Sequence, residues 1–117
     1  MYQSSKKGSF LKIEEINGFI VVQPEGKLDT VSAPEFSKEL TQILETKPKG
    51  CVIDLSQVSF LSSSGLQALL LGAKISKKEQ IRYAVCCMNE MVKDVFILSG
   101  FDRFIQTFDD RSGALAE

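Results

Sequence analysis

Short apolar segments alternate with helical patterns along the chain, and this alternation constrains the fold more than any other feature. Residues 51–55 (CVIDL) and 82–88 (RYAVCCM) are short and apolar, as expected of strands that are covered on both faces. Each is followed by apolar residues at helical spacing. Strands that are joined by helices need crossover connections and form a mostly parallel sheet. The sequence therefore predicts an α/β fold.

A β-hairpin is predicted ahead of this alternation, over residues 10–22. Residues 11–14 alternate between apolar and polar side chains, as in a half-exposed strand. Asn17 and Gly18 follow, and both tolerate the positive φ angles of a type I′ turn. Because the hairpin adds an antiparallel partner, we expect a mixed, mostly parallel sheet with helices packed on it.

The first helix is expected over residues 32–47. Ser32 and Glu35 have the spacing of a capping box, and Pro34 fits the first helical turn, where a missing N–H does little harm. The predicted apolar face of this helix consists of Phe36, Leu40, Ile43 and Leu44.

Two further helices and an edge strand complete the predicted order. The second helix starts near Leu66, and the third is capped by Asn89 and stopped by Gly100. An edge strand over residues 103–108 comes last, and the tail after it is either loose or a short helix. The inward-facing residues are predicted to be Leu66, Leu69, Leu70 and Ala73 in the second helix, and Val92, Val95 and Phe96 in the third.

With 117 residues, the chain is expected to be one domain over residues 1–117, of which residues 1–8 and 110–117 could be loose ends. No segment approaches the ~20 apolar residues of a membrane span, and the N-terminus lacks the apolar run of a signal peptide. The net charge of -1 creates no global field that would recruit nucleic acid. We expect a cytoplasmic protein with no membrane span and no direct nucleic-acid partner.

The composition argues against catalysis and against metal binding. The chain has no histidine, which removes the usual general base and the histidine-activated nucleophiles. Cys51, Cys86 and Cys87 are odd in number and lack CxxC spacing, so we expect buried, reduced thiols rather than disulfides or a zinc site. The segment SSSGL does not match GxSxG, and no Gly-rich phosphate loop is present. We predict no enzyme activity, no cofactor and no metal.

Three serines and a glycine, residues 62–65, stand where the second helix is predicted to begin. A helix cap, typically worth ~1 kcal/mol, explains one serine but not three. A helix start also accommodates a phosphate, because its free N–H groups and its dipole favour negative charge. Parallel strands end at the same edge of a sheet, so Asp29 and Asn89 are expected near this run. Phosphorylation there would change the surface that a partner meets.

The segment VIDLSQVSFLSSSGLQALL resembles the signature of STAS domains, specifically the bacterial anti-sigma factor antagonists. GKLDTVSAPEF is similar to the family's segment before its first helix, and VKDVFILSGFDRFIQTF to its third helix and last strand. The family's usual pattern is Asp-Ser-Ser-Gly-Leu, in which the second serine accepts phosphate. The match places Ser64 at the acceptor, with Ser63 as the fallback, and puts Ser62 where the family has Asp.

The resemblance implies a protein-binding module that is switched by phosphorylation. The unmodified form would bind an anti-sigma factor that is also a serine kinase, and would so release a sigma factor. Phosphorylation by the kinase would break this complex, and a serine phosphatase would restore it. Ser62 in place of the family Asp removes a negative charge beside the acceptor. The alternative is therefore a STAS scaffold that is not switched, or an accessory subunit of lipid transport.

Further residues are predicted to line the partner surface. Asp29 is either a local cap or a partner contact, and the sequence leaves both open. Asp54 is interpreted as structural, because the acidic pair of a response-regulator receiver is missing after the hairpin. The predicted partner-binding residues are Asp29, Ser62, Ser63, Gly65 and Gln67, together with Lys74 on the exposed side of the second helix.

Overall fold

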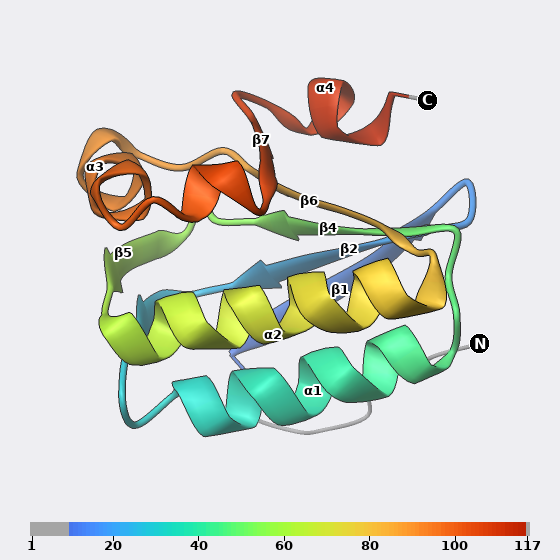
Figure 1. Cartoon of the computed structure of the whole chain (residues 1–117), viewed down its shortest axis with the longest axis horizontal. Coiled ribbons are helices and arrows are strands. Elements are labelled where there is room, and N and C mark those ends of the chain that lie inside the picture. Colours follow the sequence, from blue (N-terminus) through green and yellow to red (C-terminus); the bar gives the residue numbers. More distant parts are fainter. Residues whose placement is uncertain (1–9, 117) are drawn as a thin grey trace.

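The computed structural model describes residues 10–116, in which strands and helices alternate as predicted (Figure 1). Residues 1–8, expected as a loose end, lie outside the described residues. The strands are β1 (Leu11–Ile16), β2 (Phe19–Pro24), β3 (Gly26–Leu28), β4 (Gly50–Asp54), β5 (Val58–Leu61), β6 (Arg82–Cys86) and β7 (Gln106–Phe108). The helices are α1 (Ala33–Glu45), α2 (Ser63–Glu79), α3 (Glu90–Leu98), the 3-10 helix η1 (Phe101–Arg103) and α4 (Arg111–Leu115).

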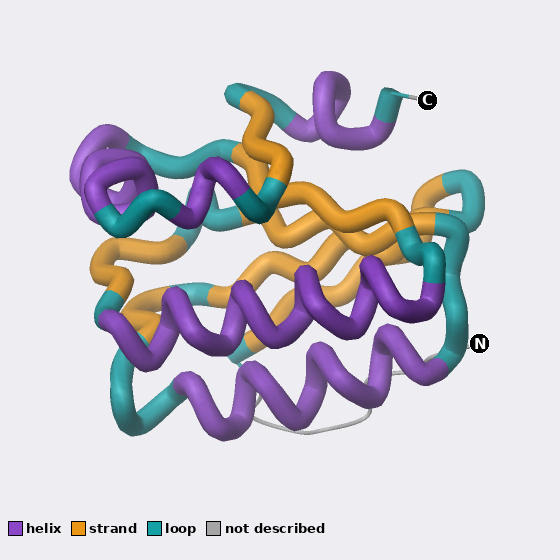
Figure 2. The backbone as a smooth tube through the Cα atoms, in the orientation of Figure 1, coloured by secondary structure: helices purple, strands orange, loops and turns teal. Residues whose placement is uncertain are grey.

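The main sheet has the strand order β1-β2-β4-β6-β7. β1 and β2 form the antiparallel hairpin, and every other pairing in this sheet is parallel. Helices α1 and α2 run side by side along one face of the sheet, whereas α4 lies over the opposite face (Figures 1 and 2). Asn17 and Gly18 have φ angles of 51° and 87°, as the predicted turn requires. The predicted mixed, mostly parallel sheet with an N-terminal hairpin is confirmed.

The principal core lies between the main sheet and the helices α1 and α2. The four residues that the sequence placed on the inner face of α1 are at most 2% exposed. A smaller cluster packs beneath α4 on the other face of the sheet. It consists of Phe19, Val21, Val52, Ala84, Cys86 and Ala114. Strand β4 is thus buried on both faces, as its apolar sequence predicted.

Helix α2 turns a slightly different face inward than the sequence predicted. Leu66 and Leu69 are buried as expected, whereas Leu70 is only half-buried and Gly72 is buried. A Cβ atom at Gly72 would lie 2.6 Å from Cδ2 of Leu40. The missing side chain therefore lets α2 approach α1 closely. The prediction for Leu70 was wrong because the buried face of α2 follows Gly65, Leu69, Gly72 and Ser76, and Leu70 lies beside it.

The start of α1 differs from the predicted capping box. Ser32 precedes the helix in a helical backbone conformation, and its side chain does not cap the helix. Its hydroxyl instead donates to the carbonyl oxygen of Lys27 at 2.5 Å and accepts from the backbone N–H of Asp29 at 3.0 Å. The capping box was wrong because this hydroxyl holds the turn between β3 and α1.

Three segments outside the main pattern complete the fold. Strands β3 and β5 form a second, parallel sheet that the sequence did not predict. The edge strand predicted over residues 103–108 is shorter than expected, because η1 precedes it and only β7 pairs with β6. Of the two alternatives for the tail, the structure has the short helix, α4. Within residues 10–116, no helix has the length and apolarity of a membrane span.

Candidate functional site

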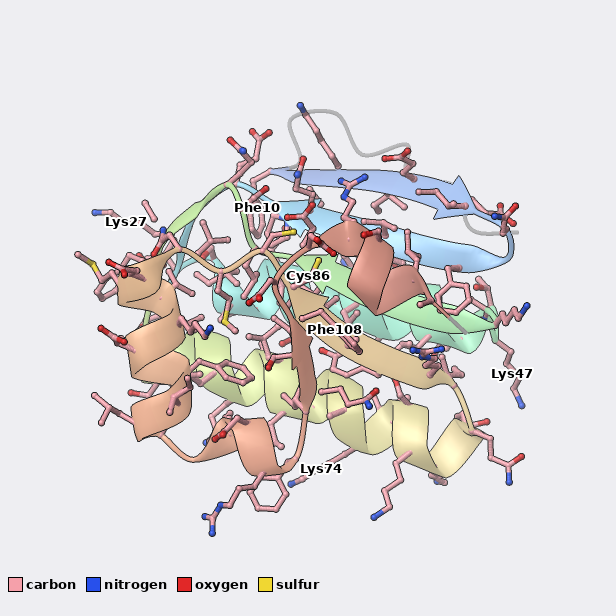
Figure 3. All side chains as sticks on the ribbon, turned by 90° about the horizontal axis from the view of Figure 1, so that it is seen from above. Phe10, Lys27, Lys47, Lys74, Cys86 and Phe108 are labelled. Atoms are coloured by element: carbon pink, nitrogen blue, oxygen red, sulfur yellow. The ribbon has the colours of Figure 1, made fainter. Side chains whose placement is uncertain are left out.

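The predicted rim is built on the small sheet at one end of the molecule. Because β3 and β5 are parallel, the residues that follow them lie at the same edge. Lys27 of β3 lies at this end, and Lys47, just after α1, lies at the opposite end (Figure 3). We use the name serine rim for Asp29 and Thr30 after β3, and for Ser62, Ser63, Ser64 and Gly65 after β5.

The backbone carbonyl of Leu28 joins the two halves of the serine rim. Its oxygen accepts from the backbone N–H of Ser62 at 2.9 Å and from the hydroxyl of Ser62 at 3.2 Å. Gly65 is buried against the same group, because a Cβ atom at Gly65 would lie only 2.5 Å from the Leu28 oxygen. The glycine of the serine run is therefore explained by close approach of two backbones.

The three serines have different environments at the start of α2. Ser62 is the N-cap residue, and its hydroxyl accepts from the backbone N–H of Gly65 at 3.4 Å. Ser63 is exposed. Ser64 is half-exposed, and its hydroxyl oxygen lies 3.4 Å from that of Thr30. One serine therefore serves as the cap, while the hydroxyl of Ser64 lies at the surface within the first helical turn.

Asp29 organises the turn that carries the other half of the serine rim. Its carboxylate accepts from the backbone N–H groups of Val31 at 3.0 Å and Ser32 at 3.1 Å. The hydrogen bond from Ser32 is the largest of the effects that lower the pKa of Asp29. Of the two roles left open by the sequence, the structure shows the local one. A contact between Asp29 and a partner stays a prediction.

Asn89 fastens the third helix to the small sheet. Its side-chain oxygen accepts from the backbone N–H of Val92 at 2.8 Å, which confirms the predicted cap of α3. Its side-chain nitrogen donates to the backbone carbonyl of Val58 at 3.1 Å. Val58 begins β5, whereas Ser62 follows its end. Asn89 thus belongs to the support of the serine rim rather than to its edge.

Replacing Asn89 with alanine should lower the free energy of unfolding by about 2 kcal/mol, because both a helix cap and a hydrogen bond to the backbone of the buried residue Val58 are lost. Asn89→Asp is the comparison variant, since it keeps the capping oxygen and replaces the donor to Val58 with a carboxylate oxygen, which also adds a negative charge at the start of α3. The stability of Asn89→Asp should lie between those of the wild type and Asn89→Ala. Urea denaturation followed by circular dichroism measures both changes, and equal losses in the two variants would contradict this division of roles.

Exposed apolar residues flank the serine rim in the chain. Val31, two residues after Asp29, is 87% exposed, and Phe60 of β5 is 46% exposed. Neither residue was predicted to line this surface, although the sequence places a bulky apolar residue close to each half of the predicted polar rim. On α2, the predicted surface residues Gln67 and Lys74 are exposed, and Lys74 points away from the molecule (Figure 3).

Asp54 is not part of the serine rim, and its contacts fit the structural role expected from the sequence. Its carboxylate accepts from Nε of Arg111 at 2.6 Å and from the backbone N–H of Ser56 at 2.9 Å. Burial alone would raise the pKa of Asp54, but the hydrogen bonds from Ser56 and Arg111 outweigh it and lower this pKa. Arg111 also binds Glu14 of β1 at 3.1 Å, so α4 is held to both β4 and β1.

The three cysteines occupy two places in the fold, and none of them forms a disulfide. Cys51 is buried in the principal core, where burial raises its pKa to about 12. Cys86 is buried beneath α4 and Cys87 is half-buried beside it, and burial is the main cause that raises the pKa of both thiols. Sequence spacing did not predict that Cys86 and Cys87 would lie next to Asp54.

Comparisons with known proteins agree with this architecture. The model of the STAS domain family matches residues 10–114. The chain is 27% identical to BtrV of Bordetella bronchiseptica, a candidate anti-sigma factor antagonist, over 91% of each chain. It is 28% identical to the anti-sigma-F factor antagonist RsfB of Mycobacterium tuberculosis, over 88% of this chain and 84% of RsfB.

A solved structure shows the same likeness in three dimensions. The crystal structure of an anti-sigma factor antagonist from Mycobacterium paratuberculosis is 28% identical in sequence, with a TM-score of 0.84 over 90% of this chain and 89% of that one. The matched family region, residues 10–114, includes the serine rim and every strand of both sheets. The chain belongs to the STAS domain family.

Proposed function

We propose that this chain is an anti-sigma factor antagonist whose binding surface, the serine rim, is switched by phosphorylation of Ser64. The observation that carries the proposal is the half-exposed hydroxyl of Ser64 in the first turn of α2. The general role is supported by relatives that bear this name and align over most of their length. The partner would be an anti-sigma factor with serine kinase activity, and a serine phosphatase would reverse the modification.

The start of α2 is electrostatically suited to a phosphoserine. Ser64 follows the N-cap residue Ser62 by two positions, so a phosphate there lies close to the free N–H groups of the first turn. Ser62 stands where the family has Asp, yet its hydroxyl accepts from Gly65 and so supplies the cap that a carboxylate would provide. The departure from the family pattern therefore leaves the acceptor turn intact.

A phosphate on Ser64 would oppose a docked partner for two reasons. It adds about 1.5–2 negative charges at the edge of the surface, where the hydroxyl of Thr30 lies only 3.4 Å away. A partner that covers the exposed side chains of Val31 and Phe60 would have to desolvate this anion. The added charge is tolerated by the helix and unfavourable for the complex, which is the requirement for a switch.

Incubation with the anti-sigma factor kinase of the source organism and ATP should add one phosphate to the chain, located at Ser64 by fragment mass spectrometry. Ser64→Ala should abolish this mass gain, and Ser63→Ala, one residue away and exposed, is the matched control that should retain it. If phosphate persists in Ser64→Ala and is lost in Ser63→Ala, the acceptor is Ser63, the fallback site, and the assignment to Ser64 is wrong.

Ser64→Asp should weaken binding to the same unmodified kinase by about tenfold or more, because a negative charge then faces the interface. Ser64→Ala, which has no charge, should bind like the wild type. Calorimetric titration measures both affinities. Partner binding without any phosphate gain, together with equal affinities of the two variants, would instead identify an unswitched scaffold or a lipid-transport accessory subunit.

A further inference from the structure

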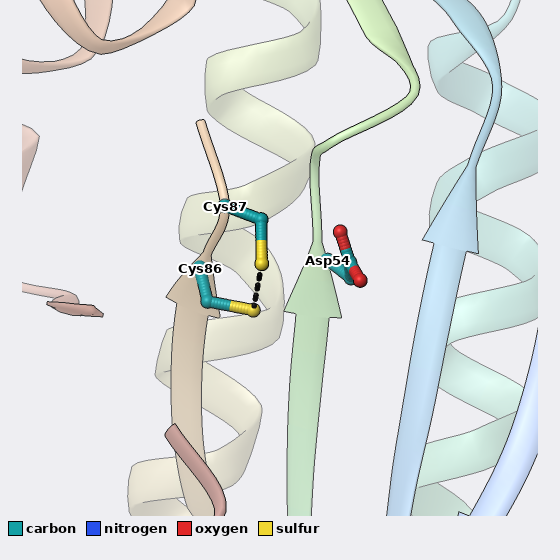
Figure 4. Close-up of side chains that lie close together, drawn as sticks. All are labelled: Asp54, Cys86 and Cys87. Carbon is teal, nitrogen blue, oxygen red and sulfur yellow. Dashed lines mark hydrogen bonds between the residues drawn. The ribbon is translucent and has the colours of Figure 1, made fainter. Parts of the chain in front are cut away.

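Asp54, Cys86 and Cys87 form a compact group of potential metal ligands, which we call the dithiol site (Figure 4). One ligand atom of each residue lies within 4.8 Å of the other two. Asp54 and Cys86 are register partners at the carboxyl ends of the parallel strands β4 and β6. This end of a parallel sheet is where α/β proteins commonly place ligand sites.

The backbone of Cys87 directs both thiols toward the same place. Neighbouring side chains in a strand normally point to opposite faces. Cys87 follows the end of β6 with a φ angle of 65°, a left-handed conformation that is uncommon for a residue other than glycine. Its sulfur lies 3.3 Å from that of Cys86, and both sulfurs lie between the ends of β6 and β4 (Figure 4). The chain thus holds two thiols beside a carboxylate.

We propose that the dithiol site binds one divalent, thiophilic metal ion such as Zn²⁺. In a tetrahedral zinc site with Zn–S bonds of about 2.3 Å, two sulfurs are separated by about 3.8 Å. The sulfurs of Cys86 and Cys87 are 3.3 Å apart, so a small opening of the pair accommodates the ion. Asp54 supplies the third ligand, and a water molecule would complete a tetrahedral site.

The charges around the site favour a divalent over a monovalent ion. Two thiolates and the carboxylate of Asp54 carry three negative charges, and Arg111, whose Nε lies 2.6 Å from that carboxylate, carries one positive charge. Because Arg111 is also paired with Glu14, a divalent cation leaves less uncompensated negative charge beside the buried Cys86 than a monovalent ion does. Arg111 also orients the carboxylate, as outer hydrogen bonds do around metal ligands.

Binding is an exchange of one ion for two protons. The thiols of Cys86 and Cys87 lose their protons to solvent as two metal–sulfur bonds form, and neither sulfur is oxidised. The reaction therefore needs no oxidant or reductant. It is independent of the serine rim, so its test does not depend on the proposed function.

Titration of the reduced full chain with Co²⁺ should produce a thiolate-to-cobalt charge-transfer band in the near ultraviolet, saturating at one ion per chain. Zn²⁺ should displace the cobalt, and calorimetry in buffers of different ionisation enthalpy should show the release of two protons. Cys87→Ser, at a half-buried position, should weaken Zn²⁺ binding by about 100-fold or more. Cys51→Ala is the matched control, since it removes a thiol outside the site and should leave the affinity unchanged.

Three results would overturn the proposal. The first is a cobalt spectrum without the charge-transfer band, and the second is Zn²⁺ binding that survives Cys87→Ser. The third is a chain that takes up no metal. If this chain also loses two hydrogen atoms under mild oxidation, Cys86 and Cys87 are instead a redox-active pair. Cys86→Ala provides a second ligand deletion, and circular dichroism confirms that each variant is folded before titration.

Discussion

Replacing Gly65 with alanine should lower the free energy of unfolding by about 2 kcal/mol, although alanine is the better helix former by about 1 kcal/mol. The new Cβ atom would lie 2.5 Å from the backbone oxygen of Leu28 and 2.9 Å from Cδ1 of Leu61. The leucine side chain can rotate, but the backbone oxygen is fixed by its hydrogen bonds to Ser62. The start of α2 must therefore move away from β3, at a cost larger than the gain in helix propensity.

Urea denaturation followed by far-ultraviolet circular dichroism is the suitable measurement, since the chain contains no tryptophan. Ser63→Ala, in the same turn and exposed, is the control and should change the stability by less than about 0.5 kcal/mol. A Gly65→Ala protein that is as stable as the wild type would show that the two backbones are not held together as described.

Arg111→Met should cost about 3 kcal/mol at pH 7, because it leaves the carboxylate of Asp54 buried without its charged partner. The side chain of Asp54 is only 4% exposed. The expected loss of stability is no larger because the backbone N–H of Ser56 and the side chain of Gln23 still donate hydrogen bonds to the carboxylate of Asp54. Methionine keeps the apolar stem of Arg111, so the change tests the charge rather than the packing.

The cost of Arg111→Met should depend on pH in a defined direction. In the wild type the folded-state pKa of Asp54 is lowered. Asp54 therefore contributes fully to the free energy of unfolding above its unfolded-state pKa of about 3.9, and this contribution is lost as the pH falls through the folded-state pKa. In the variant this pKa is higher, because burial is no longer opposed by the guanidinium. The stability difference between the two proteins should thus narrow as the pH falls from the folded-state pKa of Asp54 in the variant toward the lower folded-state pKa in the wild type.

The double variant Asp54→Asn/Arg111→Met provides the control for charge. Asparagine keeps an oxygen for the N–H of Ser56 and removes the buried negative charge. It should therefore recover most of the stability that Arg111→Met loses, as expected for coupled neighbours. If the double variant is no more stable than Arg111→Met, the stability lost in Arg111→Met comes from the packing of α4 and not from the buried charge.

Elements with local signals were predictable from the sequence. Asn17 and Gly18 specify their turn through backbone preference alone, and the apolar face of α1 follows from helical spacing. The same holds for Asn89, whose side chain caps the helix that follows it. In these cases the residues that determine the structure lie within a few positions of one another, so a local pattern contains the required information.

Elements that depend on distant partners were not predictable in the same way. Strands β3 and β5 have three and four residues, and their pairing is defined by contacts across more than 30 positions, such as that between Leu28 and Ser62. The sequence did predict that Asp29 and the serine run share a rim, because that inference needed only the direction of the strands. It did not show which strands carry them.

The dithiol site shows why residue spacing alone misses a cluster. Cys86 and Cys87 have no spacing typical of metal ligands, and the third group, Asp54, comes from the neighbouring strand. Their proximity follows from the register between β4 and β6 and from the positive φ of Cys87. The strand order and the register of the main sheet, if known beforehand, would have placed Asp54 opposite Cys86.

The position of α4 affects how the chain can fold during synthesis on the ribosome. Proteins emerge N-terminus first, so every strand leaves the exit tunnel before Arg111 does. Until then Arg111 cannot pair with Asp54, 57 positions earlier, or with Glu14, 97 positions earlier. A chain truncated before residue 111 should therefore be more sensitive to protease than the chain of 117 residues.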